Sequence, residues 1–293
     1  MRYPVTLSSF AFMTSIALAG TSSHADSPFQ SGKLLVTGGA SQVEGAGGGG
    51  LTTWALITGY GTEDGIGANT HGTLVATNDF TLRSAGAAVG FYDRFEISYS
   101  EQWFDTGTAG GRLGLGNDFE FSQQIWGAKL RLFGDAVYGQ DTWLPQVAVG
   151  VQHKNASKET ILSAVGAADD SGTDYHITAT KILLSESLLL NATARLTNAN
   201  QFGLLGHGGA GKSRSLQMEY SAAYLLDRKW VLAADFRTKP DNLAFAEEEN
   251  AWAAYVAYFF NKNASLAAGY VDLGDIALQG GQQGLYLSLQ IGF

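Results

Sequence analysis

The chain has 293 residues, of which 45% are hydrophobic, 15% are charged and none is cysteine, and its formal net charge is −9. The apolar content excludes a disordered chain, and the lack of cysteine excludes disulfides, cysteine-based zinc sites and thiol catalysis. An acidic chain without a basic block is not expected to bind nucleic acid.

The N-terminus has the pattern of a secretory signal peptide. Arg2 precedes an apolar run from Phe10 to Gly20, and the small residues Ser23 and Ala25 follow at the −3 and −1 positions of a cleavage site. The run is too short for a stable membrane anchor. We therefore expect residues 1–25 to be removed.

A glycine-rich segment follows at residues 26–50, before the region 51–293 that we expect to form the main domain. Lys33–Thr37 is a candidate first strand. The stretch Gly38–Gly50, "GGASQVEGAGGGG", has no clear period. It is either part of the strand count, a loop, or a segment folded inward as a plug.

Most of the chain alternates between apolar and polar residues with a period of two, which is typical of strands with two different faces. The strands are about 10–12 residues long, whereas a globular strand averages about 5–6 and a tilted membrane-crossing strand needs about 9–11. The clearest segments are Arg94–Trp103, Phe121–Phe133, Pro145–Lys154, Ser187–Thr197, Ser215–Leu226 and Lys229–Lys239.

The connections between these strands differ in length in a regular way. Very short turns and the C-terminus are expected at one end of the sheet and longer loops at the other, which is the asymmetry of outer-membrane barrels. Gly134–Thr142 is long for a turn, and Thr77–Asp79 is short for a loop. The short turns lie at Tyr92-Asp93, Ser185-Glu186, Asp227-Arg228 and Asn261-Lys262; the long loops lie near Asp105–Asp118, Asn155–Gly172, Asn198–Ser213, Pro240–Glu249 and Gly274–Gln283.

The fold class that follows is all-β: a transmembrane antiparallel up-and-down β-barrel. We count 13 clear strands plus the candidate at Lys33–Thr37, and because bacterial single-chain barrels use an even number, we favour about 14 strands. The alternative is 12, with Gly38–Gly50 folded inward or left as a loop.

The last segment, Gly284–Phe293, alternates to its final residue. It is expected to pair with the first strand, because an open edge in lipid would leave backbone groups unsatisfied. An ending on Phe293 resembles the C-terminal signature of Gram-negative outer-membrane proteins. We therefore expect the outer membrane of a Gram-negative bacterium as the location, and outer-membrane lipid, lipopolysaccharide and the barrel-assembly machinery as partners.

Several longer phrases, among them "GYGTEDGIGAN", "DTWLPQVAVGVQHK", "RTKPDNL" and the final "GLYLSLQIGF", resemble an uncharacterised family of proteobacterial outer-membrane barrels described as a domain of unknown function. The resemblance covers nearly all of the chain from Gly32 onward. It implies the fold and the location, and it offers no substrate and no catalytic residue.

Three other patterns suggest chemistry without the context that the chemistry needs. Gly206–Ser213, "GHGGAGKS", matches a P-loop, but a strand rather than a helix is expected after it. His71 and His176 are the histidines to test for hydrolase activity, yet neither lies in a catalytic motif. Glu247–Glu249 could bind a divalent cation, although a solvated acidic loop is the commoner explanation. We expect no enzyme activity, cofactor or metal.

The polar faces of the strands are expected to point into the lumen, where charges either line a watery path or pair with one another. The leading hypothesis is a channel that passes a small solute by diffusion, with a hydrophobic or aromatic nutrient as one candidate. The alternatives are a structural or adhesive barrel with a sealed lumen and, third, an outer-membrane hydrolase. The expected lumen-lining residues are Arg94, Glu96, Lys129, Arg131, His176, Asn191, Arg195, Glu219, Asp235 and Arg237.

Overall fold

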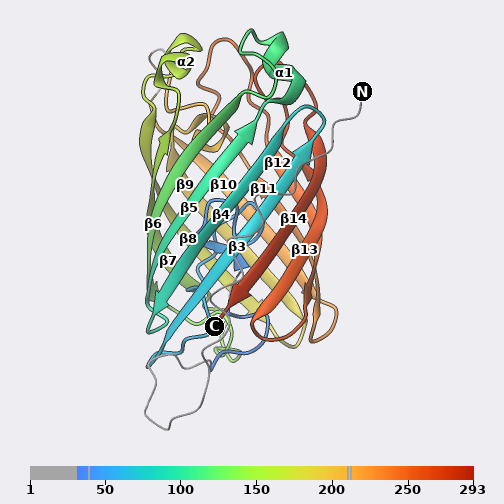
Figure 1. Ribbon diagram of the computed structural model, residues 1–293. Coiled ribbons are helices and arrows are strands. Elements are labelled where there is room, and N and C mark those ends of the chain that lie inside the picture. The colour runs from blue at the N-terminus through green and yellow to red at the C-terminus, as the bar shows by residue number, and fades with distance from the viewer. Residues whose placement is uncertain (1–31, 39, 210, 212) are drawn as a thin grey trace, which may run out of the picture.

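The computed structural model describes residues 32–38, 40–209, 211 and 213–293. Twelve of its strands form one closed antiparallel barrel (Figure 1). Each strand pairs with the next along the chain, and β14 pairs with β3 to close the sheet. The strands are β3 (Ile66–Thr77), β4 (Thr81–Phe91), β5 (Phe95–Asp105), β6 (Glu120–Phe133), β7 (Gln146–Ala156), β8 (Ser171–Leu183), β9 (Leu188–Thr197), β10 (Ser215–Leu225), β11 (Trp230–Arg237), β12 (Ala251–Phe259), β13 (Ala264–Asp272) and β14 (Gln283–Gly292).

The predicted fold class is confirmed, and the strand number is the alternative of 12 rather than the favoured 14. Lys33–Thr37 forms a turn instead of a strand. The physical reason is that the segment after it, rich in glycine, has no alternating apolar face to present to lipid, so it lies inside the barrel. The predicted signal peptide, residues 1–25, lies outside the described residues.

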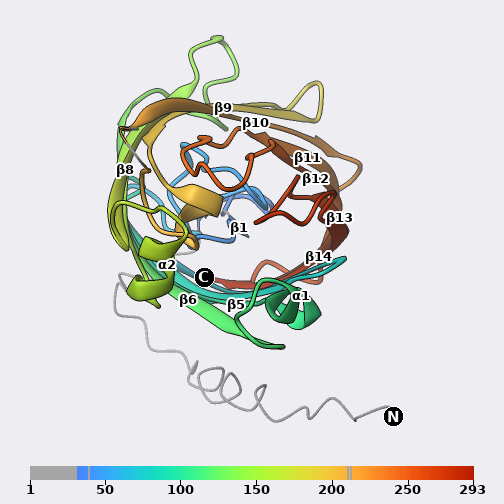
Figure 2. The same cartoon turned by 90° about the horizontal axis from the view of Figure 1, so that it is seen from above.

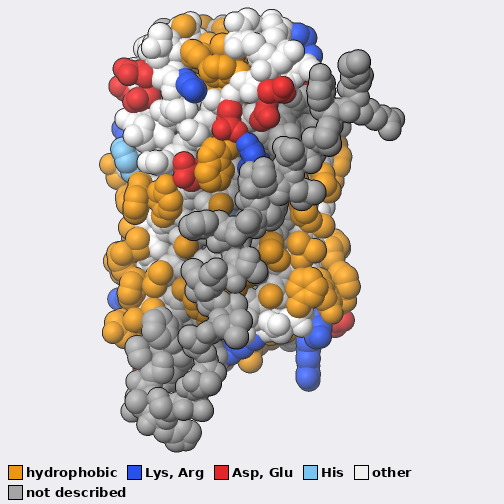
Figure 3. Space-filling model, in the orientation of Figure 1, with side chains coloured by type: hydrophobic (Ala, Val, Ile, Leu, Met, Phe, Trp, Pro, Cys, Tyr) orange, Lys and Arg blue, Asp and Glu red, His pale blue; other side chains and the backbone are white. Residues whose placement is uncertain are grey.

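The two faces of the barrel wall follow the alternation of the sequence. Side chains such as Ile97, Ile177 and Leu232 point outward and are exposed, whereas their neighbours Glu96 and Thr178 are buried inside. Figure 3 shows hydrophobic side chains on the outside of the strands on the face turned to the viewer. In a bilayer this hydrophobic band contacts the lipid chains instead of water, while the closed hydrogen-bond ladder leaves no barrel strand edge unpaired.

The two ends of the barrel differ as predicted. Most short turns and the C-terminus lie at one end, and most longer connections lie at the other (Figure 1). The exceptions are the two connections that the sequence already marked: residues 134–145 lie at the short-turn end, and residues 78–80 lie at the long-loop end. The longer connections carry the helices α1 (Gly107–Arg112) and α2 (Glu159–Ala164) and the 3-10 turn η1 (Asn200–Gly203). None of the helices in the described part of the chain is long and apolar enough to cross a membrane.

The segment Ala40–Tyr60, which we call the plug, occupies the interior of the barrel; Figure 2 shows it inside the circle of strands. It begins with a small hairpin of β1 (Ala40–Ser41) and β2 (Gly47–Gly48). Every residue from Ser41 to Tyr60 is buried. The plug leaves the barrel at the short-turn end, where Tyr60 N donates to Phe293 O (3.1 Å).

The chain passes from the plug to β3 through a tight contact that requires glycine. Gly59 has φ +80°, and a Cβ atom there would lie 2.3 Å from Ala68 N. A larger residue would therefore clash with β3 and adopt a left-handed conformation at the same time. The sequence thus fixes the plug against the first barrel strand, which begins at Ile66.

Candidate lumenal site

The plug is held near the short-turn end by a charged pair on β5 and β6. Glu96 and Lys129 are directly opposed, with Nζ 3.0 Å from Oε2. Glu96 accepts hydrogen bonds from Gly47 N and Thr58 N, both at 2.9 Å. Lys129 donates to Gly47 O and Trp54 O, both at 3.0 Å. The pair therefore binds the plug backbone through both its donors and its acceptors.

Asp235 on β11 binds the plug backbone in the same manner. Its Oδ2 accepts hydrogen bonds from Gly50 N (2.7 Å) and Leu51 N (2.9 Å), and from Tyr255 Oη (3.2 Å). Successive backbone N–H groups form a concavity that favours an anion. We call Glu96, Lys129 and Asp235 the backbone anchors.

Uncharged side chains of the wall also form hydrogen bonds with the plug backbone. Thr53 O accepts hydrogen bonds from Thr178 Oγ1 (3.2 Å), Asn191 Nδ2 (3.0 Å) and Thr193 Oγ1 (2.7 Å). These three donors replace the hydrogen bonds to water that the buried carbonyl loses, so the carbonyl is not left unpaired. The wall of the lumen is therefore matched to a polar segment of backbone.

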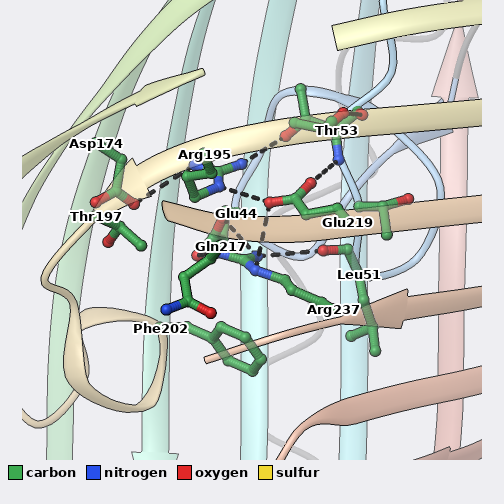
Figure 4. Close-up of polar contacts among 12 residues, drawn as sticks. Glu44, Leu51, Thr53, Asp174, Arg195, Thr197, Phe202, Gln217, Glu219 and Arg237 are labelled. Carbon is green, nitrogen blue, oxygen red and sulfur yellow. Dashed lines mark hydrogen bonds and ion pairs between the residues drawn. The ribbon is translucent and has the colours of Figure 1, made fainter. Parts of the chain in front are cut away.

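A second region of the lumen binds the plug through a side chain. Three basic and three acidic side chains alternate in a closed ring of ion pairs. Five of them come from five successive strands and one comes from the plug. The members of this ring, which we call the ion-pair ring, are Lys154 (β7), Asp174 (β8), Arg195 (β9), Glu219 (β10), Arg237 (β11) and Glu44 (plug). Figure 4 labels five of the six: Glu44, Asp174, Arg195, Glu219 and Arg237.

Glu44 closes the ion-pair ring by contacting Lys154 and Arg237, the first and the last of the five ring members that lie on strands. Its Oε1 lies 2.5 Å from Lys154 Nζ, and its Oε2 lies 3.0 Å from Arg237 Nη1. Arg237 Nη2 also donates to Oε1, at 3.2 Å. The carboxylate of Glu44 is therefore bound by two cations on opposite sides.

The other two carboxylates belong to the barrel wall. Asp174 Oδ2 lies 3.0 Å from Lys154 Nζ and 3.4 Å from Arg195 Nη1. Glu219 Oε1 lies 2.5 Å from Arg195 Nε and 3.4 Å from Arg237 Nε. The ring is neutral with Glu44 in place and carries one net positive charge without it.

All six side chains are at most 4% exposed. Burial by itself would raise the pKa of Glu44, but the positive charges of Arg237 and Lys154 outweigh it and lower the pKa below its usual value. Removing one partner of such a network is costly because it leaves an uncompensated buried charge.

The ring is covered on its other side by the connection between β9 and β10. The centre of the phenyl ring of Phe202 lies 4.4 Å from Arg237 Cζ. The backbone oxygen of Phe202 accepts a hydrogen bond from Lys154 Nζ (2.9 Å). Gln201 and Phe202 both have positive φ, 44° and 61°. For residues other than glycine this conformation costs about 1 kcal/mol or more each, so these contacts hold a strained loop over the ion-pair ring.

The loop after β11 has an ion pair of its own. Lys239 Nζ lies 3.1 Å from Glu248 Oε2. Burial lowers the pKa of Lys239 and raises the pKa of Glu248, and each charge opposes the shift of its partner. Glu248 is thus not a solvated carboxylate, and within the described residues no group of three or more His, Asp and Glu side chains is placed to hold a metal ion.

Of the ten residues expected in the lumen, eight are buried in the structure: Glu96, Lys129, His176, Asn191, Arg195, Glu219, Asp235 and Arg237. Arg94 is exposed in the turn between β4 and β5, so it does not face the lumen. Arg131 lies by the same turn, where it pairs with Asp93 and donates to Gly134 O (2.6 Å). The alternation of inward and outward side chains ends at this turn. The period of two, which predicted an inward position for Arg94, therefore does not apply there.

Three ring members, Glu44, Lys154 and Asp174, were missed from the sequence. Lys154 and Asp174 continue the polar faces of their strands, so a longer alternation window would have found both. Glu44 lies in a glycine-rich stretch without a period. Its place in the ring depends on the tertiary fold of the plug, and no local pattern indicates it.

The other sequence patterns do not assemble into sites. Gly206–Ser213 is followed by strand β10 and no helix, and Lys212 lies outside the described residues. His71 Nε2 lies 3.2 Å from Ser84 Oγ, but its Nδ1 has no hydrogen-bond partner among the described residues. Neither ring nitrogen of His176 has one. Neither histidine therefore has the orienting carboxylate of a catalytic triad.

Two cavities, of about 610 and 540 Å³, lie on the outer wall of the barrel. Outward-pointing residues line them, such as Leu190 and Tyr220 in the first and Tyr175 and Leu216 in the second. They lie within the hydrophobic band, where lipid chains would pack. The lumen, by contrast, is occupied by the plug.

These features define a porin-like transmembrane β-barrel whose lumen is filled by its own N-terminal segment. A family model described as "Protein of unknown function (DUF3034)" matches residues 37–290, and the chain belongs to this family. The resemblance to an uncharacterised family of outer-membrane barrels is therefore confirmed. No curated protein sequence matches the chain.

Solved structures with a similar fold include two porins. The KdgM porin has 7% sequence identity and a TM-score of 0.50, over 78% of this chain and 99% of that chain. The NanC porin has 9% identity and a TM-score of 0.51, over 76% of this chain and 98% of that chain. At these identities the likeness concerns the fold alone.

Proposed function

We propose that this protein is a channel in the outer membrane of a Gram-negative bacterium, and that the plug closes it. A small solute passes when the plug moves out of its contacts with the wall. Outer-membrane lipid and lipopolysaccharide surround the hydrophobic band, and the assembly machinery engages the last strand, β14, together with Phe293, which follows it.

The observation that carries this proposal is the polarity of the wall beneath the plug. Glu96, Lys129 and Asp235 would be stable against water as well as against the plug backbone, because each would exchange one set of hydrogen bonds for another. A wall meant only to be filled could use apolar side chains, which pack without polar partners. The same polarity favours a polar solute over the hydrophobic or aromatic candidate.

A sealed structural barrel is the second candidate function, and the ion-pair ring favours it. Six buried charges that are fully paired resist opening, because each broken pair leaves a charge without compensation. In this case the plug never leaves, and the outer loops carry the function. The two proposals differ in whether the plug moves.

A disulfide lock between plug and wall separates them. Thr52 Oγ1 and Ser221 Oγ are 2.5 Å apart, close to the distance between the two sulfurs of a disulfide. Because the native chain has no cysteine, the double variant Thr52→Cys/Ser221→Cys contains only the engineered pair. The single variant Thr52→Cys is the matched control.

The measurement is single-channel conductance of the refolded protein in planar bilayers. We expect openings in the wild type and in the reduced double variant, and none in the oxidised double variant; reduction should restore them. Openings that persist in the oxidised form would mean that the plug is not the gate.

A second variant, Glu96→Gln/Asp235→Asn, weakens the hydrogen bonds between plug and wall. It is needed because the wild-type channel could open too rarely for its openings to be observed. It removes two charged acceptors for plug N–H groups and should open more often than the wild type. Silence of this variant as well, in a protein with confirmed barrel structure, would reject the channel in favour of the sealed barrel.

A further inference from the structure

The ion-pair ring contains one member that can leave without unfolding the barrel. Asp174 and Glu219 are fixed on strands, as are Lys154, Arg195 and Arg237. Glu44 alone belongs to the plug, at the tip of the β1–β2 hairpin next to Gly45, which has φ +95°. Movement of the plug therefore removes one carboxylate and leaves its two cations in place.

We propose that the position between Lys154 and Arg237 is a binding site for a solute carboxylate, and that Glu44 occupies it in the closed state. This inference rests on the proposed channel function and names its substrate class: small organic carboxylates. A solute carboxylate that binds there restores the neutral ring and replaces Glu44, so binding of the solute favours release of the plug.

The geometry of the site is that of a carboxylate receptor. Lys154 Nζ and the two Nη atoms of Arg237 converge on one carboxylate at 2.5 to 3.2 Å. Charge-assisted hydrogen bonds of this kind are stronger than neutral ones, and a guanidinium group fits the two oxygens of a carboxylate. Arg195, on the next strand but one from Lys154, adds positive charge to the same place.

The site also lies at the end of the lumen that carries the longer connections, near the ends of β7 and β11. The loop that contains Phe202 covers it, and both Lys154 and Arg237 contact that residue. The backbone anchors contact other parts of the plug, from Gly47 to Thr58. The tip of the plug and the outer loop thus meet at Glu44.

A second observation indicates capacity for a polar ligand around the ring. Gln152 and Gln123 each use one amide atom: Gln152 Oε1 accepts from Arg195 Nη1, and Gln123 Nε2 donates to Gln102 Oε1 and to Phe202 O. Gln152 Nε2 and Gln123 Oε1 are buried and have no hydrogen-bond partner among the described residues, and the same holds for His207 Nε2. Native structures rarely leave such atoms unpaired, so these groups are available to the rest of a bound solute or to water.

The test is chemical rescue in the full-length mature protein. Glu44→Ala removes the carboxylate between Lys154 and Arg237, and propionate is the small carboxylate used as the probe. We expect Glu44→Ala to lower the melting temperature, and sodium propionate at millimolar concentrations to raise it again. Propionamide and sodium chloride at equal concentration control for the charge and for ionic strength.

Two variants keep the result interpretable. The wild type, whose site is filled by Glu44, should show no comparable shift with propionate. Glu44→Ala/Lys154→Met should bind propionate at least about tenfold more weakly, because one charge-assisted hydrogen bond is lost. If this double variant does not fold, Glu44→Ala/Lys154→Arg, which keeps the charge, should retain the propionate-dependent shift.

Failure of propionate to stabilise Glu44→Ala, or an equal effect of propionamide, would overturn the carboxylate site whatever the conductance shows. A silent channel in all variants would reject the proposed function whatever the rescue shows. If propionate stabilises Glu44→Ala and the channel opens, propionate added on the long-loop side should raise the opening frequency of the wild-type channel, and chloride at equal concentration should not. The absence of this difference would overturn the coupling of solute binding to plug release.

Discussion

The wall of this barrel holds one plug in two different ways. The backbone anchors bind N–H and C=O groups that any peptide carries, through Glu96, Lys129 and Asp235. The ion-pair ring binds one particular side chain, that of Glu44. The backbone anchors require a polypeptide in the lumen, whereas the site that binds the carboxylate of Glu44 can bind any small molecule that carries a carboxylate. The first region therefore maintains closure, and the second can be exchanged for a ligand.

The largest effect is expected at the anchors. Lys129→Met leaves Glu96 buried without its cation, and breaking a buried pair in this way costs about 3–5 kcal/mol. The free energy of unfolding in urea measures the loss. Glu96 keeps its two bonds from plug N–H groups, so we expect a value toward the lower end of that range.

Two further variants sharpen this result. Lys129→Met/Glu96→Gln should recover part of the loss, because the uncompensated charge is gone. Lys229→Met, in an exposed turn, is the matched control and should change little. An equal loss in Lys129→Met and in the control would mean that the anchors do not carry the stability of the plug.

The second effect tests whether the ring end is sensitive to acid. His207 lies in the loop that covers the ring, and burial, together with the charge of Lys154, lowers its pKa to about 4. The unfolded chain keeps the usual value of 6.5. The folded state therefore binds the proton more weakly, and the stability contributed by neutral His207 is complete above pH 6.5 and lost as the pH falls toward 4.

The difference of about 2.5 pH units corresponds to at most about 3 kcal/mol. Urea unfolding of the wild type and of His207→Gln at pH 7.5, 6 and 4.5 measures it. The wild type should lose more stability than His207→Gln between the first and the last pH. Parallel curves would show that His207 does not couple the loop to acid.

Much of the wall could be predicted from the sequence, and little of the plug. Alternation alone places Glu219, Asp235 and Arg237 on inward faces, because a strand has a period of two and one face meets lipid. The same rule fails at Arg94, where the strand ends. The plug has no period, since many of its contacts with the wall are made by backbone groups, and its side-chain contacts, such as those of Thr52 and Glu44, follow no regular spacing.

The partners of a backbone anchor are therefore invisible to pattern analysis. Nothing in the letters around Gly50 and Leu51 indicates that their N–H groups bind Asp235, about 185 residues away. What the sequence does indicate is a glycine-rich segment that lacks a lipid-facing side. That property is sufficient to suggest an inward fold and insufficient to give its register.

A smaller effect separates charge from shape at the anchors. Asp235→Asn keeps an oxygen for Gly50 N and Leu51 N but removes its charge, and we expect a loss of about 2 kcal/mol. Urea unfolding measures it, with the exposed Glu63→Gln as the control. If Asp235→Asn were as stable as the control, the amide would replace the carboxylate fully, and the anchor would depend on hydrogen-bond geometry alone.

The smallest effect concerns the cover of the ring. Phe202→Ala removes the ring from the face of Arg237, a cation–π contact worth about 1 kcal/mol. Since this contact holds the strained loop over Glu44, its loss should raise the opening frequency about fivefold at constant single-channel conductance. Phe202→Leu keeps apolar volume without the aromatic face. If Phe202→Leu opens as often as Phe202→Ala, the cation–π contact holds the loop over the ion-pair ring. If Phe202→Leu opens as rarely as the wild type, apolar packing holds the loop. In that case the ring end is kept closed by packing, whereas the anchor end is kept closed by hydrogen bonds.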